Sequence, residues 1–343
     1  MGVMIGDDKG DCSLCHLIVL TGPTSVGKTS LSVRLARRLG GEIISADSMQ
    51  VYKHMDIGTA KITKEEMQGV PHHLIDILEP TEEYNVARFK EEAAAAIADI
   101  SSRNMVPIIV GGTGFYIQAL LYDVDFTDKA QTGYRLKLTE LAKEKGSGYL
   151  YDMLLECDPG ACEYISRNDV MRLSRALEYY HETGEPISLH NKMERKKKAA
   201  YGFRYFVLNQ PREILYENIN KRVDMMMENG LLDEVIKLRE MGCDSAMTSM
   251  KGLSYKELLE YLDGNITLEE AVRIIKRDTR HFAKRQITWF KRERDVIWIN
   301  KEEFGYDEDR MLDYMCDISG IGHALYDEKR TVPVVIGRCN ESE

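Results

Sequence analysis

The stretch GPTSVGKT at residues 22–29 decides the fold, because it lies between the apolar run LIVLT and the amphipathic segment SLSVRLARRL. Gly22 and Gly27 allow the backbone to curl so that its N–H groups converge on an anion at the positive end of the following helix. Lys28 adds a positive charge, and the hydroxyl of Thr29 is placed to ligate Mg²⁺. The stretch therefore predicts a phosphate-binding loop between a buried strand and a helix.

The surrounding sequence alternates between short apolar runs and segments with helical spacing. The further runs expected to form strands are GEIISAD (41–47), HHLIDIL (72–78), MVPIIVGGTG (105–114) and GFRYFVLNQ (202–210). Residues 29–39 and 85–103 are expected to form helices, with Asn85 as the N-cap of the second. This alternation predicts an α/β fold of the P-loop NTPase type, with a parallel sheet flanked by helices.

The middle of the chain has a different pattern. From residue 122 to about residue 198 the strand signal disappears, and the sequence is polar and helical, with NDVMRLSRALEYYHETG as its clearest helix. The simplest organisation is one sheet domain interrupted by a helical insertion domain. The expected parts are an N-terminal leader (1–16), the first part of the core (17–121), the helical insertion domain (122–200), the return strand and C-terminal helices of the core (201–300), and an acidic tail (301–343).

Charge is unevenly distributed along the chain. The formal net charge of −10 argues against a nucleic-acid partner, but residues 299–343 alone carry eleven acidic and five basic residues. Residues 273–294 carry nine basic residues and two acidic ones. A local positive excess of this size is compatible with binding to a phosphate backbone despite the acidic total.

Length and residue usage indicate a globular cytoplasmic protein. The 343 residues are 43% hydrophobic, which is enough for a sizeable core. The sequence contains no uncharged apolar run long enough to span a membrane, and the N-terminus lacks the pattern of a secretion signal. The seven cysteines show no paired framework, which suits reduced thiols. The motif CSLCH at residues 12–16 has the spacing of a haem attachment site, but such attachment requires export.

The phosphate loop alone does not establish an NTPase. An NTPase normally carries a second strand that ends in an acid and helps to hold Mg²⁺, whereas the run VPIIVGG ends in glycines. The acid is instead Asp47, which follows EIIS and is close in sequence to Ser48 and Gln50. At the end of a strand, this group of side chains favours a site for a second substrate. The alternative is that Asp47 caps a helix and Gln50 is solvated.

Seven motifs follow one another along the chain: GPTSVGKT, ISADSMQVYKHMDIGTAK, PHHLIDI, GGTGFYI, DVMRLSRALE, GLSYKEL and RQITWFKR. In these motifs, and in their order, the chain resembles the tRNA dimethylallyltransferases, also called tRNA isopentenyltransferases, from about residue 17 to residue 298. The resemblance implies that the chain transfers a dimethylallyl group from dimethylallyl diphosphate to N6 of adenosine 37, beside the anticodon of tRNA. The loop would then hold a diphosphate leaving group, and no second acid for a γ-phosphate is needed.

The resemblance also implies catalytic roles. The N6 amine is a poor nucleophile because its lone pair is delocalised, so a base should accelerate its attack by about 10²–10⁴-fold, and Asp47 is the candidate. Arg222 is the candidate for stabilising the departing diphosphate, although Asn218 stands where relatives often carry another arginine. The alternative for Arg222 is a helix-surface pair with Glu217 or Asp224.

Thr113 resembles the family's tRNA-contacting threonine and is grouped with the catalytic candidates, the alternative being a plain turn residue. Mg²⁺ is the expected cofactor, with Thr29 as its ligand, and it would stabilise the charge that develops on the diphosphate. The residues expected to bind the diphosphate are Gly22, Thr24, Ser25, Val26, Gly27, Lys28 and Thr29.

The tRNA is expected to bind through the anticodon stem-loop. Because the target adenine is stacked, it must be extracted before attack, and Gln50 is expected to read its edge with a paired amide donor and acceptor. Five basic residues from Arg273 to Lys291 fall on one helical stripe, which suits a phosphate backbone although such a stripe is often only solvated. The residues expected to contact tRNA are Ser48, Met49, Gln50, Met171, Arg172, Arg175, Lys251, Tyr255, Arg277, Arg280, Lys284 and Arg285.

Other functions stay open on the sequence alone. An adenylate isopentenyltransferase acting on free AMP, ADP or ATP would share the loop and Asp47 but would have little use for the basic stripe. A small-molecule kinase is disfavoured by the glycine-ended strand. A non-catalytic RNA-binding protein that uses nucleotide only as a structural ligand would bind without turnover. The chain is expected to be a monomer, and its sequence does not indicate which tRNAs it selects.

Overall fold

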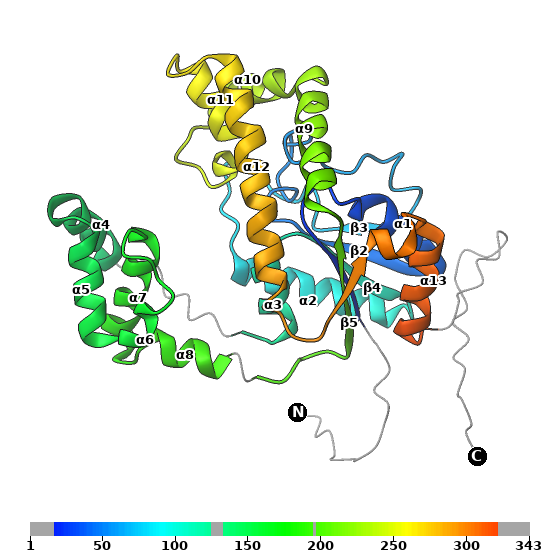
Figure 1. Ribbon diagram of the computed structural model, residues 1–343, viewed down its shortest axis with the longest axis horizontal. Helices are drawn as coiled ribbons and strands as arrows, with labels where there is room; N and C mark the ends of the chain where they lie inside the picture. Colours follow the sequence, from blue (N-terminus) through cyan, green and yellow to red (C-terminus); the bar gives the residue numbers. More distant parts are fainter. Residues whose placement is uncertain (1–16, 125–132, 195–196, 322–343) are drawn as a thin grey trace. The chain divides into compact units, whose positions relative to one another are not determined.

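The strand before the phosphate loop lies inside a parallel sheet (Figure 1). The structure is a computed structural model that describes residues 17–124, 133–194 and 197–321. Within these residues the strand order is β3-β2-β4-β1-β5-β6, and every neighbouring pair is parallel. The strands are β1 (Leu17–Thr21), β2 (Gly41–Ala46), β3 (His72–His73), β4 (Val106–Gly111), β5 (Phe203–Asn209) and β6 (Val296–Asn300). The predicted α/β fold is confirmed.

The strands at the centre of the sheet are apolar because helices cover both faces of a parallel sheet. All of β1 is buried, and it pairs with β4 on one side and with β5 on the other. The run expected to form a strand at 72–78 pairs with β2 only through His72 and His73. Leu74 and Asp76 have positive φ values of 61° and 55°, so the backbone leaves the ladder after two residues.

The first two helices match the expectation closely. Helix α1 (Lys28–Leu39) begins directly after Gly27 and ends at Gly40. Helix α2 (Val86–Ser102) begins after Asn85, whose side chain accepts a hydrogen bond from a backbone N–H in the first turn. The predicted N-cap is therefore present, and it satisfies one of the unpaired donors of the helix.

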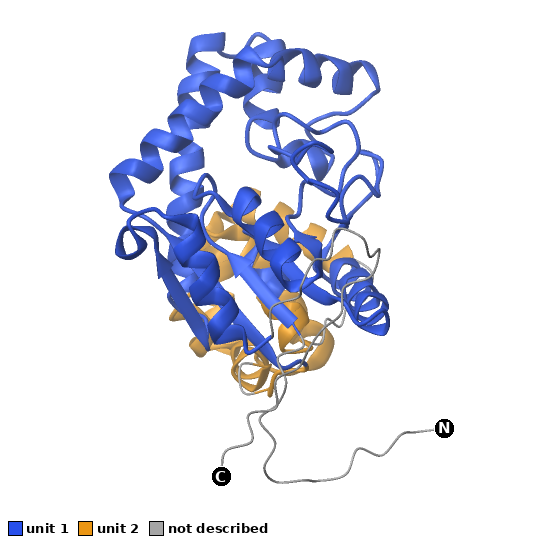
Figure 2. Ribbon diagram, turned by 90° about the vertical axis from the view of Figure 1, so that its right-hand side faces the viewer, with its two compact units in different colours: residues 1–117, 201–343 blue, residues 118–200 orange. Residues whose placement is uncertain are grey.

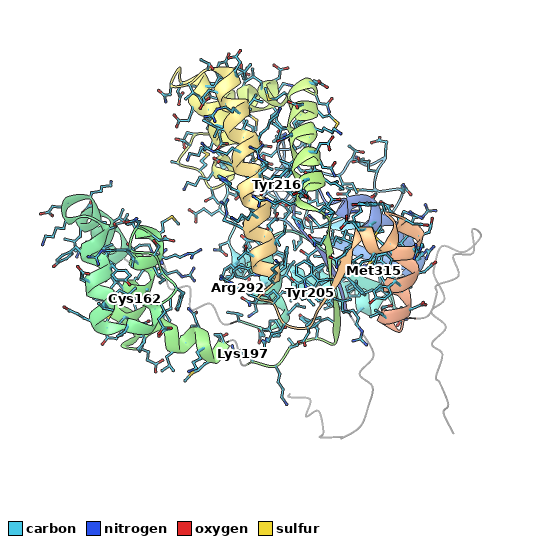
Figure 3. All side chains as sticks on the ribbon, in the orientation of Figure 1. Cys162, Lys197, Tyr205, Tyr216, Arg292 and Met315 are labelled. Carbon is cyan, nitrogen blue, oxygen red and sulfur yellow. The ribbon has the colours of Figure 1, made fainter. Side chains whose placement is uncertain are left out.

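A second group of helices follows β5. They are α9 (Arg212–Glu228), α10 (Leu231–Glu240), the short 3₁₀ helix η1 (Ser249–Lys251), α11 (Tyr255–Leu262) and α12 (Leu268–Phe290). Helices α9 and α12 pack side by side (Figure 1), and the guanidinium of Arg280 on α12 lies 6.0 Å from the ring centroid of Tyr216 on α9, which is labelled in Figure 3. No helix in the described ranges combines the length and the apolar character that crossing a membrane requires.

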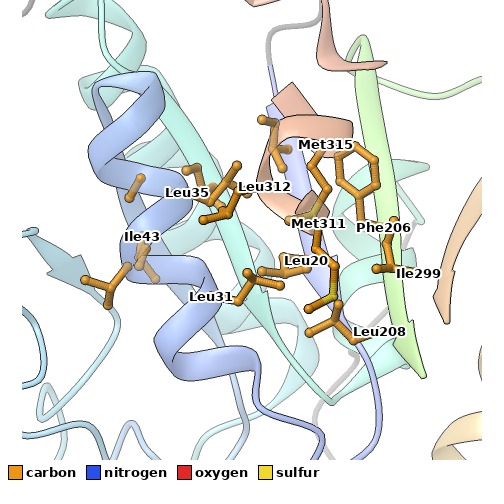
Figure 4. Close-up of a cluster of buried hydrophobic side chains, with 14 of the residues drawn as sticks. Leu20, Leu31, Leu35, Ile43, Phe206, Leu208, Ile299, Met311, Leu312 and Met315 are labelled. Carbon is orange, nitrogen blue, oxygen red and sulfur yellow. The ribbon is translucent and has the colours of Figure 1, made fainter. Parts of the chain in front are cut away.

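The C-terminal part of the chain differs from the expectation of an acidic tail that starts at residue 301. Edge strand β6 is followed by the 3₁₀ helix η2 (Lys301–Phe304) and helix α13 (Glu308–Ser319), which packs on α1 (Figure 4). The buried residues of α13 include Met311, Leu312, Met315 and Cys316. Residues 301–319 are thus part of the core, and the leader (1–16) and residues 322–343 lie outside the described residues.

The acidic residues of α13 have partners far away in the sequence. Arg34 of α1 pairs with Glu308 and Asp309, and Arg38 pairs with Asp309 and Asp313. Because exposed ion pairs contribute little individually, the buried side chains of α13 supply most of its docking energy. A count of charge along the sequence could not detect this helix, since its basic partners lie more than 270 positions earlier.

The chain divides into two compact units (Figure 2). The first unit is residues 1–117 with 201–343, and the second is residues 118–200. The helices α3 to α8 are α3 (Gly114–Leu121), α4 (Gly133–Lys145), α5 (Ser147–Cys157), α6 (Pro159–Cys162), α7 (Val170–Thr183) and α8 (Ile187–Glu194). The second unit has its own apolar core. In it, the buried carboxylate of Asp158 accepts hydrogen bonds from the backbone N–H groups of Ala161 and Ser188.

Candidate active site

A pocket of about 360 Å³ lies at the carboxyl ends of β1, β2 and β4 and is walled by residues of α9 and α12. Ligands of open parallel sheets bind at this edge. The predicted site residues that line the pocket are Thr24, Asp47, Ser48, Met49, Thr113, Arg222, Lys251, Tyr255 and Arg285. The fold therefore brings Thr24 of the phosphate loop, residues after β2 and β4, and residues of α9, α11 and α12 to one pocket. The other six residues expected to bind the diphosphate are not among those that line it.

The phosphate loop has the curled backbone that its glycines predict. Gly22 has a φ of 149°, and a Cβ at this position would lie 2.6 Å from the carbonyl oxygen of Leu208, so the neighbouring strand excludes any side chain. Ser25 has a φ of 63°, and its buried hydroxyl has no hydrogen-bond partner within the described residues. An unpaired buried hydroxyl is costly, and a phosphate oxygen could accept its proton.

Lys28 turns back over its own loop. Its Nζ donates hydrogen bonds to the carbonyl oxygens of Gly22 and Pro23, each at 2.9 Å. Burial, together with the positive charge of Arg222, lowers the pKa of Lys28 to about 7, while the nearby carboxylate of Asp47 acts in the opposite direction. The ammonium is thus poised to lose its proton near neutral pH until an anion binds beside it.

Arg222 points from α9 toward the phosphate loop. Its Nη1 lies 3.4 Å from the hydroxyl oxygen of Thr24, and burial lowers its pKa although Asp47 partly compensates. The alternative of a helix-surface pair is not realised. Glu217 pairs with Lys221 and Asp224 pairs with Lys276. The guanidinium is therefore held where it can meet the diphosphate that the loop is expected to bind.

Asp47 follows β2 directly and faces the same pocket as Thr113. Its Oδ1 accepts a hydrogen bond from the backbone N–H of Met49 at 2.9 Å, which forms a tight turn. No helix begins there, so Asp47 is not a helix cap. Thr113 lies just after β4, and its backbone N–H donates to the carbonyl oxygen of Ala46 at 3.3 Å. The two candidate residues are consequently joined through the backbone of neighbouring strands.

Gln50 has a different environment from the one expected. Its Nε2 donates to the backbone carbonyl oxygens of Thr59 at 3.2 Å and Ala60 at 3.4 Å, and its Oε1 accepts from the hydroxyl of Ser45 at 3.4 Å. Gln50 is not among the residues that line the pocket. Adenine recognition by Gln50 therefore stays a prediction, and it requires these hydrogen bonds to be exchanged.

Tyr255 is among the residues that line the pocket, and its side chain is fully buried. Its hydroxyl donates to Oε1 of Glu234 at 2.7 Å, and burial beside this carboxylate raises the pKa of Tyr255. Glu234 also accepts hydrogen bonds from the backbone N–H groups of Asp56, Ile57 and Gly58. The carboxylate of Glu234 thus holds both Tyr255 and the loop at residues 56–58, which leads into the pocket wall. These contacts indicate a structural role for the hydroxyl of Tyr255.

Replacing Tyr255 with phenylalanine should lower the free energy of unfolding by about 1–3 kcal/mol, because Glu234 loses one of its buried donors. The affinity for tRNA should change little, since the hydroxyl is directed at Glu234. Urea denaturation and a tRNA-binding titration measure the two effects, and Tyr261→Phe on the same helix is the control. A large loss of tRNA affinity at unchanged stability would assign the hydroxyl to the RNA.

The predicted basic stripe of α12 is exposed along part of its length. Arg277 and Lys284 are exposed, whereas Nη1 of Arg280 donates to Oδ1 of Asn220 on α9 at 2.6 Å. Arg277 is also paired with the adjacent Asp278. Arg273 pairs with Glu270. Lys284 within the helix and Lys291 at its C-cap are therefore the members of the stripe best placed to meet an anionic partner.

Three further tRNA candidates lie on α7 in the second unit. Met171 is 84% exposed, and Arg172 and Arg175 are also exposed. Arg172 lies 3.4 Å from the carboxylate of Asp169, the N-cap of the helix. The start of α7 thus presents an exposed apolar side chain beside two exposed arginines, and its contact with tRNA stays a prediction.

Several pocket residues were not singled out from the sequence. Ile219, Val223, Met226 and Phe282 form an apolar wall on α9 and α12, and Gln286 reaches the phosphate loop. Gln286 lies within RQITWFKR, one of the seven motifs that carry the family resemblance, but the motif itself does not indicate a role for this side chain. For Glu234 no local pattern exists, because its partners lie in a loop about 178 positions earlier.

Comparison with known proteins identifies the family. The IPP transferase family matches residues 50–293, and the isopentenyl transferase family matches residues 15–81. A tRNA dimethylallyltransferase from Lachnoclostridium phytofermentans is 59% identical over 292 residues, which cover 85% of this chain and 93% of the relative. This chain belongs to the tRNA dimethylallyltransferase family. A second member, from Acetivibrio thermocellus, is 51% identical over 85% of this chain and 94% of its own length.

Solved structures of family members have the same fold. The tRNA isopentenylpyrophosphate transferase of Bacillus halodurans is 42% identical with a TM-score of 0.66, covering 88% of this chain and 96% of that one. A eukaryotic dimethylallyltransferase acting on tRNA is 30% identical with a TM-score of 0.74, covering 88% of this chain and 78% of that one. The enzymatic class expected from the seven motifs is confirmed.

Proposed function

We propose that this protein transfers the dimethylallyl group of dimethylallyl diphosphate to N6 of adenosine 37 in the anticodon loop of tRNA and releases diphosphate. The observation that carries the proposal is that Thr24 of the phosphate loop, Asp47 and Arg222 line one pocket, with Arg222 in contact with Thr24. In this arrangement the carboxylate of Asp47 would act on the purine amine, and Lys28 and Arg222 would act on the leaving group. The site thus has a base for the nucleophile and cations for the diphosphate.

The roles of the residues follow from their places in the pocket. Asp47 accepts the proton from N6 as the new C–N bond forms, and the allylic C–O bond breaks with its electron pair moving to the diphosphate. The loop N–H groups, Lys28 and Arg222 stabilise the negative charge that develops on the leaving group. The apolar wall formed by Val223, Met226 and Phe282 excludes water from the reacting carbon.

Mg²⁺ fits the loop as a partner of the diphosphate. Thr29 is half-buried in the first turn of α1, and its hydroxyl together with diphosphate oxygens gives the hard oxygen ligands that Mg²⁺ prefers. No group of three or more His, Cys, Asp or Glu side chains that could hold a metal gathers in the described ranges. The ion would therefore be held by Thr29 and the substrate, and it would neutralise charge on the leaving group.

Two of the rival functions are weakened by specific features. An adenylate isopentenyltransferase acting on free nucleotides is not favoured, because the similar relatives are tRNA enzymes. A small-molecule kinase would need a carboxylate after β4, where this chain has Gly112 and Thr113. The cytoplasmic location and the monomeric state stay predictions.

The decisive experiment is incubation of the protein with dimethylallyl diphosphate, Mg²⁺ and unmodified tRNA, with AMP in place of tRNA in a parallel reaction. Nucleoside mass analysis should find a five-carbon adduct on adenosine from tRNA and none on AMP. An adduct on AMP alone would favour the free-nucleotide enzyme. Binding of tRNA without any adduct would favour a non-catalytic RNA-binding protein.

Lys284 should contribute to tRNA binding through a phosphate contact. Lys284→Ala is expected to reduce the slope of log affinity against log salt concentration by about one, since one fewer counterion is released. Lys276→Ala is a matched control, because it removes the same charge from the same helix while its amine pairs with Asp224 at 2.5 Å. Titrations at several salt concentrations give the slopes, and equal slopes for both variants would remove Lys284 from the interface.

A further inference from the structure

Gln286 lies on the buried side of α12 and is only 6% exposed. Its Oε1 accepts a hydrogen bond from the backbone N–H of Thr24 at 2.9 Å, and its Nε2 donates to the carbonyl oxygen of Gly112 at 2.9 Å. A single side-chain amide therefore joins the phosphate loop after β1 to the turn after β4. Both of its polar ends are used, as a buried amide requires.

The contacts of Gln286 continue on both sides to the candidate catalytic residues. On one side, the hydroxyl of Thr24 lies 3.4 Å from Nη1 of Arg222. On the other side, Gly112 is followed by Thr113, whose backbone N–H donates to the residue before Asp47 at 3.3 Å. A chain of backbone links and hydrogen bonds thus runs from the leaving-group side of the pocket to the base side, with Gln286 in its middle.

The side chain of Gln286 is tightly packed against the turn after β4. A Cβ on Gly112 would lie 2.2 Å from Nε2 of Gln286, and a Cβ on Gly111 would lie 2.3 Å from the carbonyl oxygen of Ala46. The glycines that end β4 thereby allow the amide and the neighbouring strand to approach the turn closely. The distance between the phosphate loop and this turn is set by direct contact.

We propose that Gln286 is a positioning residue for group transfer, which fixes the separation between the diphosphate loop and the turn that carries Thr113. This inference rests on the proposed function. Transfer requires the nucleophile and the allylic carbon to lie about 3–3.5 Å apart, and a displacement of about 1 Å can cost roughly 100-fold in rate. In addition, Thr24 directs its N–H at Gln286, so the diphosphate is bound by the N–H groups further along the loop.

A double-mutant cycle tests this role. Gln286→Ala removes both hydrogen bonds, and Gly112→Ala leaves the core intact but displaces the amide, since the other atoms near the new Cβ lie at 3.4 Å or more. Thr288→Ala, on the exposed side of α12, is the control. The measurements are the single-turnover rate of transfer at saturating substrates, the affinity for tRNA, and the affinity for magnesium diphosphate without RNA.

We expect Gln286→Ala to lower the single-turnover rate by about 100-fold and Gly112→Ala to lower it by about 10-fold, with tRNA affinity retained. In the double variant the added methyl group finds the space left by Gln286, so its rate should be no lower than that of Gln286→Ala. Gln286→Ala should also weaken magnesium diphosphate binding by about 10-fold, because the loop loses its anchor. Thr288→Ala should behave like the wild type.

Two results would overturn the inference: a Gln286→Ala rate within about threefold of the wild type, or additive losses around the cycle, which would mean that Gly112→Ala does not act through the amide of Gln286. A wild-type protein that forms no five-carbon adduct under the same conditions contradicts the proposed function instead. In that case the diphosphate titrations still decide the role of Gln286, and equal affinities for wild type and Gln286→Ala would exclude it.

Discussion

Asp47→Asn is expected to lower the single-turnover rate of dimethylallyl transfer by about 10²–10⁴-fold, the usual contribution of a general base. The substitution keeps the side-chain shape, and its amide oxygen can still accept the hydrogen bond from Met49 that Oδ1 of Asp47 accepts at 2.9 Å. The turn and the pocket should therefore persist. What is lost is a group that can take the proton from N6 during attack.

The affinity for tRNA separates this explanation from a loss of fold or of binding. It should stay close to that of the wild type in Asp47→Asn, and so should the midpoint of thermal unfolding. Asp99→Asn provides a control, because this carboxylate is 62% exposed on α2 and pairs with Arg103 away from the pocket. If Asp47→Asn retains a near-normal rate in a single turnover, another group must accept the proton.

The central sheet could be predicted because its information is local. Each central strand is an apolar run bounded by glycines or polar turns, and the phosphate loop fixes which strand precedes which helix. Strand β6 escaped prediction because it lies at the edge of the sheet, where most of its residues are only half-buried. Helix α13 escaped prediction because its acidic residues are typical of a solvated segment. Their partners Arg34 and Arg38 are far away in the sequence and become apparent only in the folded structure.

The candidate site shows the same division between local and distant information. Lys28, Thr29 and Asp47 lie within motifs whose chemistry can be interpreted from neighbouring residues. Gln286 and Glu234 satisfy backbone groups 174 to 262 positions away, and no pattern in their own helices announces those partners. The roles of these two residues therefore could not be predicted from the sequence, because they depend on contacts that only the folded chain forms.

Helix α12 has two faces of different character, and its sequence pattern indicates only one of them. Its exposed side carries Arg277 and Lys284, while its buried side places Phe282 and Gln286 at the pocket. Further along, the indole of Trp289 occupies the space beside Gly114, where a Cβ would lie 2.3 Å from the ring. The helix whose exposed face we expect to contact RNA therefore also shapes the pocket with its buried face.

Lys28→Met is expected to lower the transfer rate by about 10²–10³-fold, comparable with removing one donor that stabilises a developing anion. It should also remove a pH dependence. Burial and Arg222 hold the pKa of Lys28 at about 7 in the free protein. A bound diphosphate adds negative charge beside the ammonium and raises this pKa, because the charged form is now favoured.

The direction of the pH effect follows from this difference in pKa. Below pH 7 Lys28 is protonated in both the free and the bound protein, so its titration does not alter the affinity for diphosphate. Above pH 7 the free protein has lost this proton while the complex retains it, so binding takes up a proton and the affinity falls as the pH rises. The fall continues until the higher pKa of the complex is reached.

Calorimetric titration with magnesium diphosphate at pH 8, in two buffers of different ionisation enthalpy, measures the proton uptake directly. The wild type should take up more protons than Lys28→Met, which lacks the titrating amine. Lys28→Arg, which stays charged throughout this range, should resemble Lys28→Met in proton uptake while binding diphosphate more tightly. Equal proton uptake by the wild type and both variants would show that Lys28 keeps its ordinary pKa in the free protein and binds the leaving group as a permanent cation.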